Sequence, residues 1–229
     1  MWGMSAARIR DLSLYLVADV DSAAGKDLVR IVKEAVSGGV TAVQLRAKSL
    51  DTSAFLELAV RLGKALRGKS VPLIINDRVD IAVAGRAAGV HLGQGDMAPD
   101  KARKVLGSRS IVGVSVNTLE EALAAERLGA DYVGLGPIFP TATKETGLPI
   151  IGPEGVRKVC EAVTIPVVAI GGINAVNVAE IMEAGASGIA VVSAILGAAN
   201  PRRAAADLKD AIARHRTPGP DAPPATGTT

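Results

Sequence analysis

The chain has 229 residues, a length that fits one large α/β domain or two small ones. Hydrophobic residues make up 48% and aromatic residues only 2%, so a core would consist of Val, Ile, Leu and Ala, which favours buried parallel strands over an aromatic-rich sandwich. A net charge of +3 is too small to argue for a polyanion, and so few aromatics offer little for base stacking, so we expect no nucleic-acid partner.

Membrane and export signals are not apparent in the sequence. No unbroken apolar run reaches the length of a membrane span, and no apolar segment follows the basic residues near the N-terminus, so we expect neither a membrane segment nor a signal peptide. The single Cys160 excludes an internal disulfide and fits a cytoplasmic, reducing compartment.

Short apolar runs recur along the chain with helix-like stretches between them. The runs cover residues 14–18, 42–45, 73–75, 90–92, 111–114, 132–135, 167–170 and 189–192. Most are continuous rather than alternating, which is typical of strands covered on both faces. Eight such βα units predict a single-domain (β/α)8 TIM barrel. A doubly wound open sheet is the alternative, but it usually has fewer strands, and no glycine-rich dinucleotide fingerprint follows the first run.

Helical periodicity between the runs supports this alternation. Two predicted buried helix faces consist of Leu28, Ile31, Val32 and Ala35, and of Leu119, Ala122, Leu123 and Leu128. Thr118 and Glu121 have the spacing of a capping box, and Asn174 is the predicted start of a helix over residues 176–184. We predict one barrel domain over residues 1–216, and a disordered tail over 217–229 because that segment is rich in Pro, Gly and Thr without periodicity.

The predicted barrel places an active site at the carboxyl ends of its strands. After the second run, alternation puts Gln44, Arg46 and Lys48 on one side, where a guanidinium fork and an ammonium suit phosphate oxygens. Asp77 and Asp96 follow the third and fourth runs, and two carboxylates with substrate phosphate suit Mg²⁺. The alternatives are a charge pair at the start of a helix for the cations, a helix N-cap for Asp77 and a turn residue for Asp96.

The segment after the sixth run ends the strand at Gly136-Pro137 and continues into a loop with three hydroxyls and Lys144. It is either an anion-binding surface or a solvated loop. Gly171 and Gly172 after the seventh run and Ser193 after the eighth predict a phosphate nest of backbone N–H groups. Two anion sites indicate two phosphorylated substrates, or one with phosphates at both ends.

Three further polar residues carry weaker signals. Ser115, in the fifth strand exit, is either a ligand donor or a hydroxyl satisfied at a helix start. His91 lies in mid-strand without an evident base partner and is predicted to be structural. Cys160 is predicted to be an inert buried thiol.

Together these segments resemble the thiamine-phosphate synthase family, also called thiamine-phosphate pyrophosphorylases. The matching motifs occur in family order over about residues 14–208: residues 44–48, 75–78, 91–96, 113–115, 136–144, 169–173 and 192–195. The family has a (β/α)8 barrel. This chain departs from its pattern at Ala142, where the family usually has Pro, and in the continuation Glu145-Thr146-Gly147.

The resemblance implies a role for each matching residue. The group implied to bind hydroxymethylpyrimidine diphosphate is Gln44, Leu45, Arg46, Ala47, Lys48, Asn76, Ser115 and Lys144. The group implied to bind thiazole phosphate is Thr141, Ala142, Thr143, Gly172, Val192 and Ser193. Arg46, Lys48, Ser115 and Lys144 are the implied catalytic residues, and Asp77 and Asp96 would hold one Mg²⁺ per active site.

The implied reaction is a transfer that joins the two substrates into thiamine phosphate and releases pyrophosphate, in a cytoplasmic enzyme of thiamine biosynthesis. Its partners are small phosphorylated molecules rather than nucleic acid or membrane, and a homo-oligomer is compatible with it. Two alternatives stay open at this point: a thiazole tautomerase-like paralogue, and a non-catalytic thiazole-phosphate binding protein.

Overall fold

The computed structural model describes residues 11–141 and 147–215. The predicted tail, residues 217–229, lies outside the described part. The strands are β1 (Leu14–Asp19), β2 (Ala42–Arg46), β3 (Leu73–Asn76), β4 (Gly89–Leu92), β5 (Ile111–Val116), β6 (Tyr132–Leu135), β7 (Val167–Ile170) and β8 (Gly188–Val191). The helices are α1 (Leu28–Ser37), α2 (Thr52–Ala65), α3 (Val79–Ala84), α4 (Pro99–Leu106), α5 (Leu119–Arg127), α6 (Gly152–Ala162), α7 (Val178–Glu183), α8 (Ser193–Leu196) and α9 (Pro201–His215).

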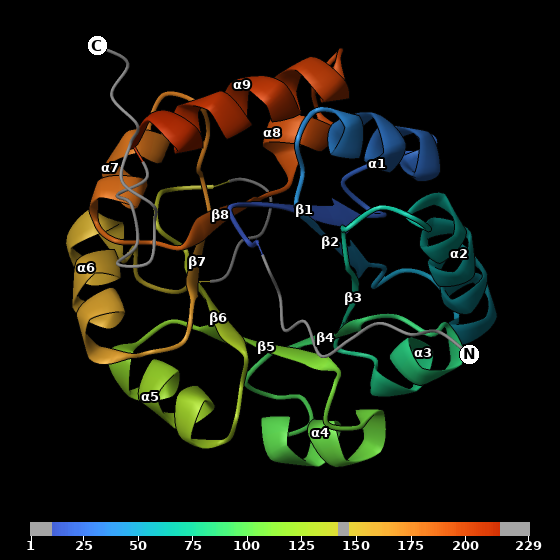
Figure 1. Ribbon diagram of the computed structural model, residues 1–229, viewed down its shortest axis with the longest axis horizontal. Coiled ribbons are helices and arrows are strands. Elements are labelled where there is room, and N and C mark those ends of the chain that lie inside the picture. Colours follow the sequence, from blue (N-terminus) through green and yellow to red (C-terminus); the bar gives the residue numbers. More distant parts are fainter. Residues whose placement is uncertain (1–10, 142–146, 216–229) are drawn as a thin grey trace, which may run out of the picture.

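The strands form a closed parallel barrel in chain order, with β8 paired to β1. The helices surround it, and α9 packs beside α1 and α7 over the point of closure (Figure 1). The predicted (β/α)8 barrel is therefore confirmed. Parallel pairing brings the carboxyl ends of all strands to one end of the barrel; for example, Asp19 at the end of β1 lies opposite Arg46 at the end of β2.

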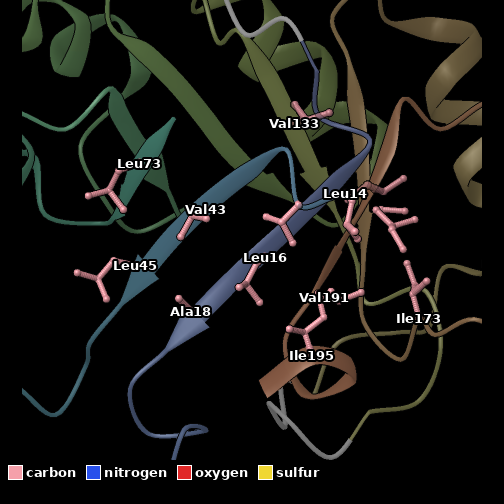
Figure 2. Packing of buried hydrophobic residues seen from close by; sticks show 14 of the residues in the cluster. Leu14, Leu16, Ala18, Val43, Leu45, Leu73, Val133, Ile173, Val191 and Ile195 are labelled. Carbon is pink, nitrogen blue, oxygen red and sulfur yellow. The ribbon is translucent and has the colours of Figure 1, made fainter. Parts of the chain in front are cut away.

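The outer core lies between the strands and the helices. Leu14, Leu16 and Ala18 follow one another along one side of β1 (Figure 2) and belong to the same buried cluster as Ile31 and Val32 of α1. The predicted buried face of α1 is confirmed, since Leu28, Ile31, Val32 and Ala35 are all buried. Burying a Leu or Ile side chain contributes about 1.5–3 kcal/mol, so this aliphatic layer is the main source of stability.

A second, smaller cluster fills the inside of the barrel. Its members come from strands or from the segment before β1, and none comes from a helix: Leu12, Tyr15, Val17, Ala42, Ile74, Ile111, Tyr132, Val168 and Ala190. Tyr15 and Val17 alternate with Leu14, Leu16 and Ala18 along β1, so the period of two along each strand separates the two cores. The inner cluster is where the chain places both of its tyrosines.

Helix ends confirm some sequence predictions and correct others. Thr118 Oγ1 accepts from Glu121 N at 3.2 Å, as predicted, but Glu121 Oε2 accepts from Asn117 N rather than from Thr118 N. Leu128 is the C-cap of α5 and is 44% exposed, so its predicted place on the buried face is wrong. The helix predicted to start at Asn174 begins at Val178 with Asn177 as N-cap, because residues 175–177 form a turn before it and Asn177 Oδ1 accepts from Asn174 N.

Replacing Thr118 with Ala is expected to lower the free energy of unfolding by about 1 kcal/mol, because one amide at the start of α5 loses its cap. Chemical denaturation of both proteins measures the difference. Ser53→Ala, at an exposed position in the first turn of α2, is a comparison in which the cap from Asp51 stays in place. An equal loss in the two variants would contradict the capping role.

Within the described part, no helix is both long enough and apolar enough to span a lipid bilayer.

Candidate active site

The ends of β1 and β2 carry an ion pair. Asp19 is buried, at 4% exposed, and its Oδ1 accepts from Arg46 Nη1 at 2.9 Å while its Oδ2 accepts from Ser22 Oγ at 2.6 Å. The Arg46 side chain is about a quarter exposed, so the pair orients the guanidinium at the mouth of the barrel. Asp19 was absent from the predicted site. Its position at a strand exit, in register with Arg46, is the signal that could have identified it.

Lys48, Asp77 and Asp96 meet across the loops after β2, β3 and β4. The Lys48 ammonium forms an ion pair with Asp77, and the Asp77 and Asp96 carboxyl groups are hydrogen-bonded to each other. Asp77 adopts a left-handed φ of 59°, and its amide donates to His91 O at 2.8 Å. This conformation is uncommon outside Gly and is held by the surrounding turn. The predicted meeting of the two acids with a lysine is thus present.

The two carboxyl groups differ in their proton affinity. Burial disfavours the charged form of Asp77, but hydrogen bonds from Lys48 and Asp96 outweigh this effect and lower the pKa of Asp77. Burial and the neighbouring Asp77 raise the pKa of Asp96. Two neighbouring carboxyl groups of opposite pKa shift are a donor set that a divalent cation can occupy, because the positive charge of the ion relieves the repulsion between them. Among the described residues, no group of three or more His, Cys, Asp or Glu could hold a metal.

Three residues of the predicted pyrimidine site lie away from its surface. Gln44 is buried inside the barrel, where its Nε2 donates to the Tyr15 hydroxyl at 3.2 Å. Leu45 and Ala47 are buried in the outer core, so only their backbone can face a ligand. Asn76 closes β3 and is partly exposed.

Ser115 and His91 are in contact, which the sequence did not indicate. His91 Nε2 lies 2.9 Å from Ser115 Oγ, and His91 Nδ1 lies 2.9 Å from the Tyr132 hydroxyl. The expectation that His91 lacks a partner is therefore wrong. Neighbouring strands bring the two residues together: β4 and β5 pair with His91 opposite Gly113, two residues before Ser115.

The loops after β6 and β7 are joined by backbone hydrogen bonds. Phe139 N donates to Gly171 O at 3.0 Å, and a Cβ on Gly172 would lie 2.5 Å from Pro140 O. Gly172 also has a left-handed φ of 66°, so both conformation and space require glycine there. Thr141 is the last residue described before the gap. Ala142, Thr143 and Lys144, all of them predicted ligand contacts, lie outside the described residues.

The exit of β8 leads directly into α8. Val192 is its N-cap and Ser193 its first residue, and at the other end Lys26 Nζ donates to Leu196 O at 3.1 Å. A short helix after the eighth strand is the feature that commonly contributes to phosphate binding in such barrels.

Comparison with known proteins identifies the family. A sequence model described as "Thiamine monophosphate synthase" matches residues 14–195. Thiamine-phosphate synthase of Albidiferax ferrireducens is 48% identical over 90% of this chain and 94% of its own, and that of Chloroflexus aurantiacus is 47% identical over 90% and 95%. The solved structure of a thiamine phosphate pyrophosphorylase from Pyrococcus furiosus is 42% identical, covers 89% of this chain and 96% of its own, and superposes with a TM-score of 0.81.

These matches span nearly the whole barrel, and they include each strand exit described above. The chain belongs to the thiamine monophosphate synthase family.

Proposed function

We propose that this protein is a transferase that condenses hydroxymethylpyrimidine diphosphate with thiazole phosphate, giving thiamine phosphate and pyrophosphate. The observation that carries the proposal is the group formed by Arg46, Lys48, Asp77, Asp96 and Ser115, which four neighbouring strands, β2 to β5, bring to one end of the barrel. Two cations beside two acids suit a diphosphate with a divalent ion. Relatives with 42–48% identity bear the matching name.

The chemistry needs a departing diphosphate and a nucleophile held in line. The bond between the pyrimidine methylene carbon and the diphosphate oxygen breaks, its electron pair leaves with pyrophosphate, and the aminopyrimidine stabilises the cation. The thiazole nitrogen then forms the C–N bond with its free lone pair, so no proton must be removed. Arg46, Lys48 and Lys144 neutralise charge that grows on the leaving oxygens, and such preorganised charge is commonly a large part of catalysis.

The proposal assigns Asp77 and Asp96 to one Mg²⁺. They fit the ion because Mg²⁺ uses one or two carboxylates and completes its octahedron with water and substrate phosphate. When bound, the ion would supply further positive charge to the diphosphate. The ion pair between Lys48 and Asp77 holds that carboxylate ionised and facing the same region as the cations.

The second substrate is assigned to the loops after β6, β7 and β8. Thr141, Ala142, Thr143, Gly172, Val192 and Ser193 form the proposed thiazole-phosphate site. The joined β6 and β7 loops and the position of Ser193 at the start of α8 support this assignment. A cytoplasmic location and assembly into a homo-oligomer remain predictions that belong to the same proposal.

A two-substrate assay tests the activity. Purified protein incubated with both substrates and Mg²⁺ is expected to form thiamine phosphate and pyrophosphate in equal amounts, detected by chromatography. Folded protein that forms neither product would contradict the proposal. Calorimetry separates the alternatives, since a non-catalytic binding protein would bind thiazole phosphate but show no Mg²⁺-dependent binding of the pyrimidine diphosphate.

Asp96→Asn is expected to raise the Mg²⁺ concentration required for half-maximal activity by at least about tenfold, because one proposed ligand loses its charge. A Mg²⁺ titration of the initial rate measures the change. Asp100→Asn, which removes an acid paired with Lys104 on α4, is the control and should leave the titration unchanged. An unchanged titration in Asp96→Asn would remove Asp96 from the metal site.

A further inference from the structure

A continuous chain of side chains crosses the inside of the barrel beneath the proposed site. Gln44 Nε2 contacts the Tyr15 hydroxyl at 3.2 Å, Tyr15 contacts the Tyr132 hydroxyl at 2.8 Å, and Tyr132 contacts His91 Nδ1 at 2.9 Å. His91 Nε2 then contacts Ser115 Oγ at 2.9 Å. This series of side-chain contacts thus joins β2 to β5 through β1, β6 and β4. One of its ends, Ser115, belongs to the proposed pyrimidine diphosphate site, and the other, Gln44, is buried inside the barrel.

The barrel interior is shaped to admit these rings. A Cβ on Gly113 would lie 2.1 Å from Tyr132 Cζ, and a Cβ on Gly134 would lie 3.0 Å from His91 Cε1. Glycine inside a strand weakens the strand and often marks a place where another group approaches the backbone closely. Here Gly113 faces the Tyr132 ring and Gly134 faces the His91 ring. The whole protein contains only two tyrosines and two histidines. Three of these four residues lie in the hydrogen-bonded network.

Counting donors gives the network a direction. The Gln44 amide donates to the Tyr15 oxygen, whereas either hydroxyl can donate in the contact between Tyr15 and Tyr132. The arrangement that gives every proton an acceptor inside the network has Tyr15 donating to Tyr132 and Tyr132 donating to His91 Nδ1. Burial raises the pKa of both tyrosines, so each keeps the proton that it donates.

The contact between His91 and Ser115 determines whether the Ser115 hydroxyl can donate a hydrogen bond to a ligand. With Nδ1 accepting, a neutral His91 carries its proton on Nε2 and donates it to Ser115 Oγ. The Ser115 hydroxyl proton is then available to an acceptor outside the network. Turning the Gln44 amide would reverse each bond and direct that proton to His91 instead.

We propose that Tyr15, Tyr132 and His91 are positioning residues that orient the Ser115 hydroxyl as a hydrogen-bond donor toward the diphosphate leaving group. The inference rests on the proposed function, because it concerns how that site treats its diphosphate. The three residues act from below the site: Tyr15 and Tyr132 are fully buried, whereas Ser115 is partly exposed near the end of β5. The same network holds the Gln44 amide in one of its two orientations.

Tyr132→Phe tests the inference because it keeps the ring and removes only the hydroxyl. We expect kcat to fall about tenfold while the KM for thiazole phosphate is unchanged, since His91 no longer has its tautomer fixed. Ser115→Ala is expected to lower kcat about 100-fold, and Tyr132→Phe should have no further effect in the Ser115→Ala background. A loss that came only from a weakened barrel would instead multiply with that of Ser115→Ala.

Further variants keep the test decisive. Tyr15→Phe, which removes the hydroxyl that bonds Tyr132, is expected to lower kcat in the same direction by a smaller factor and serves if Tyr132→Phe does not fold. Thr41→Val, which removes a hydroxyl that bonds Leu14 at the other end of the barrel, should retain wild-type kcat. Unchanged kinetics in both Phe variants, or multiplicative losses in the double variant, would overturn the inference. Folded wild-type protein without product would overturn the proposed function as well.

Discussion

Arg46→Gln is expected to lower kcat/KM by about 10²–10³-fold, because the substitution removes a cation that we propose neutralises charge on the leaving diphosphate. The same change should lower the free energy of unfolding by about 1–3 kcal/mol, since Asp19 would remain buried without its charged partner. Steady-state kinetics with both substrates and a urea denaturation series measure the two effects.

Two companion variants separate charge from structure. Arg46→Lys keeps a positive charge beside Asp19 but loses the planar fork, so it should recover most of the stability and only part of the activity. Asp19→Asn combined with Arg46→Gln removes both charges and should regain stability while remaining nearly inactive. If the double variant regained activity together with stability, the role of Arg46 would be structural only.

Gly113→Ala is expected to lower the free energy of unfolding by roughly 2–5 kcal/mol. The added Cβ would lie 2.1 Å from Tyr132 Cζ and 2.4 Å from its hydroxyl oxygen, so the ring must move away from Tyr15 and His91. Overpacking in a well-packed core costs about 1–3 kcal/mol, and each buried partner left unsatisfied adds a comparable amount. Thermal unfolding should show a melting temperature lower by about 10 °C.

Gly63→Ala is the matched control for that experiment. Gly63 lies in α2, where the nearest atom to an added Cβ is Leu73 Cδ2 at 4.0 Å, so there is room for the methyl group. Alanine in a helix interior should raise stability by about 0.5–1 kcal/mol. A Gly113→Ala variant as stable as the wild type would show that the tyrosine ring does not need the glycine.

The polar residues at the carboxyl ends of the strands could be predicted from the sequence, because they depend only on the order of residues along each short segment. Apolar runs at regular spacing define the βα units, and parallel strands must present their carboxyl ends at one end of the barrel. Arg46, Lys48, Asp77, Asp96 and Ser115 each follow or end such a run, so local order was enough to group them.

The buried network could not be predicted in this way. In the sequence, Tyr132 lies 41 residues from its partner His91 and 117 residues from its partner Tyr15. Each of the three residues stands in an apolar strand, where a core residue is the ordinary expectation. Asp19 was overlooked although it ends β1, because its partner Arg46 lies 27 residues away in the sequence. The failed placement of Leu128 had the opposite cause, because helical spacing continued the apolar pattern one residue past the end of α5.

The sequence by itself determined the barrel, the order of its strands and the group of polar residues at its mouth, because periodicity and strand polarity are local properties. Only the tertiary structure decided which of those residues touch: the pairing of Arg46 with buried Asp19, of Lys48 with Asp77, and of Ser115 with His91. Those contacts depend on the register between neighbouring strands and on the space left by Gly113 and Gly134, and closing the barrel sets both.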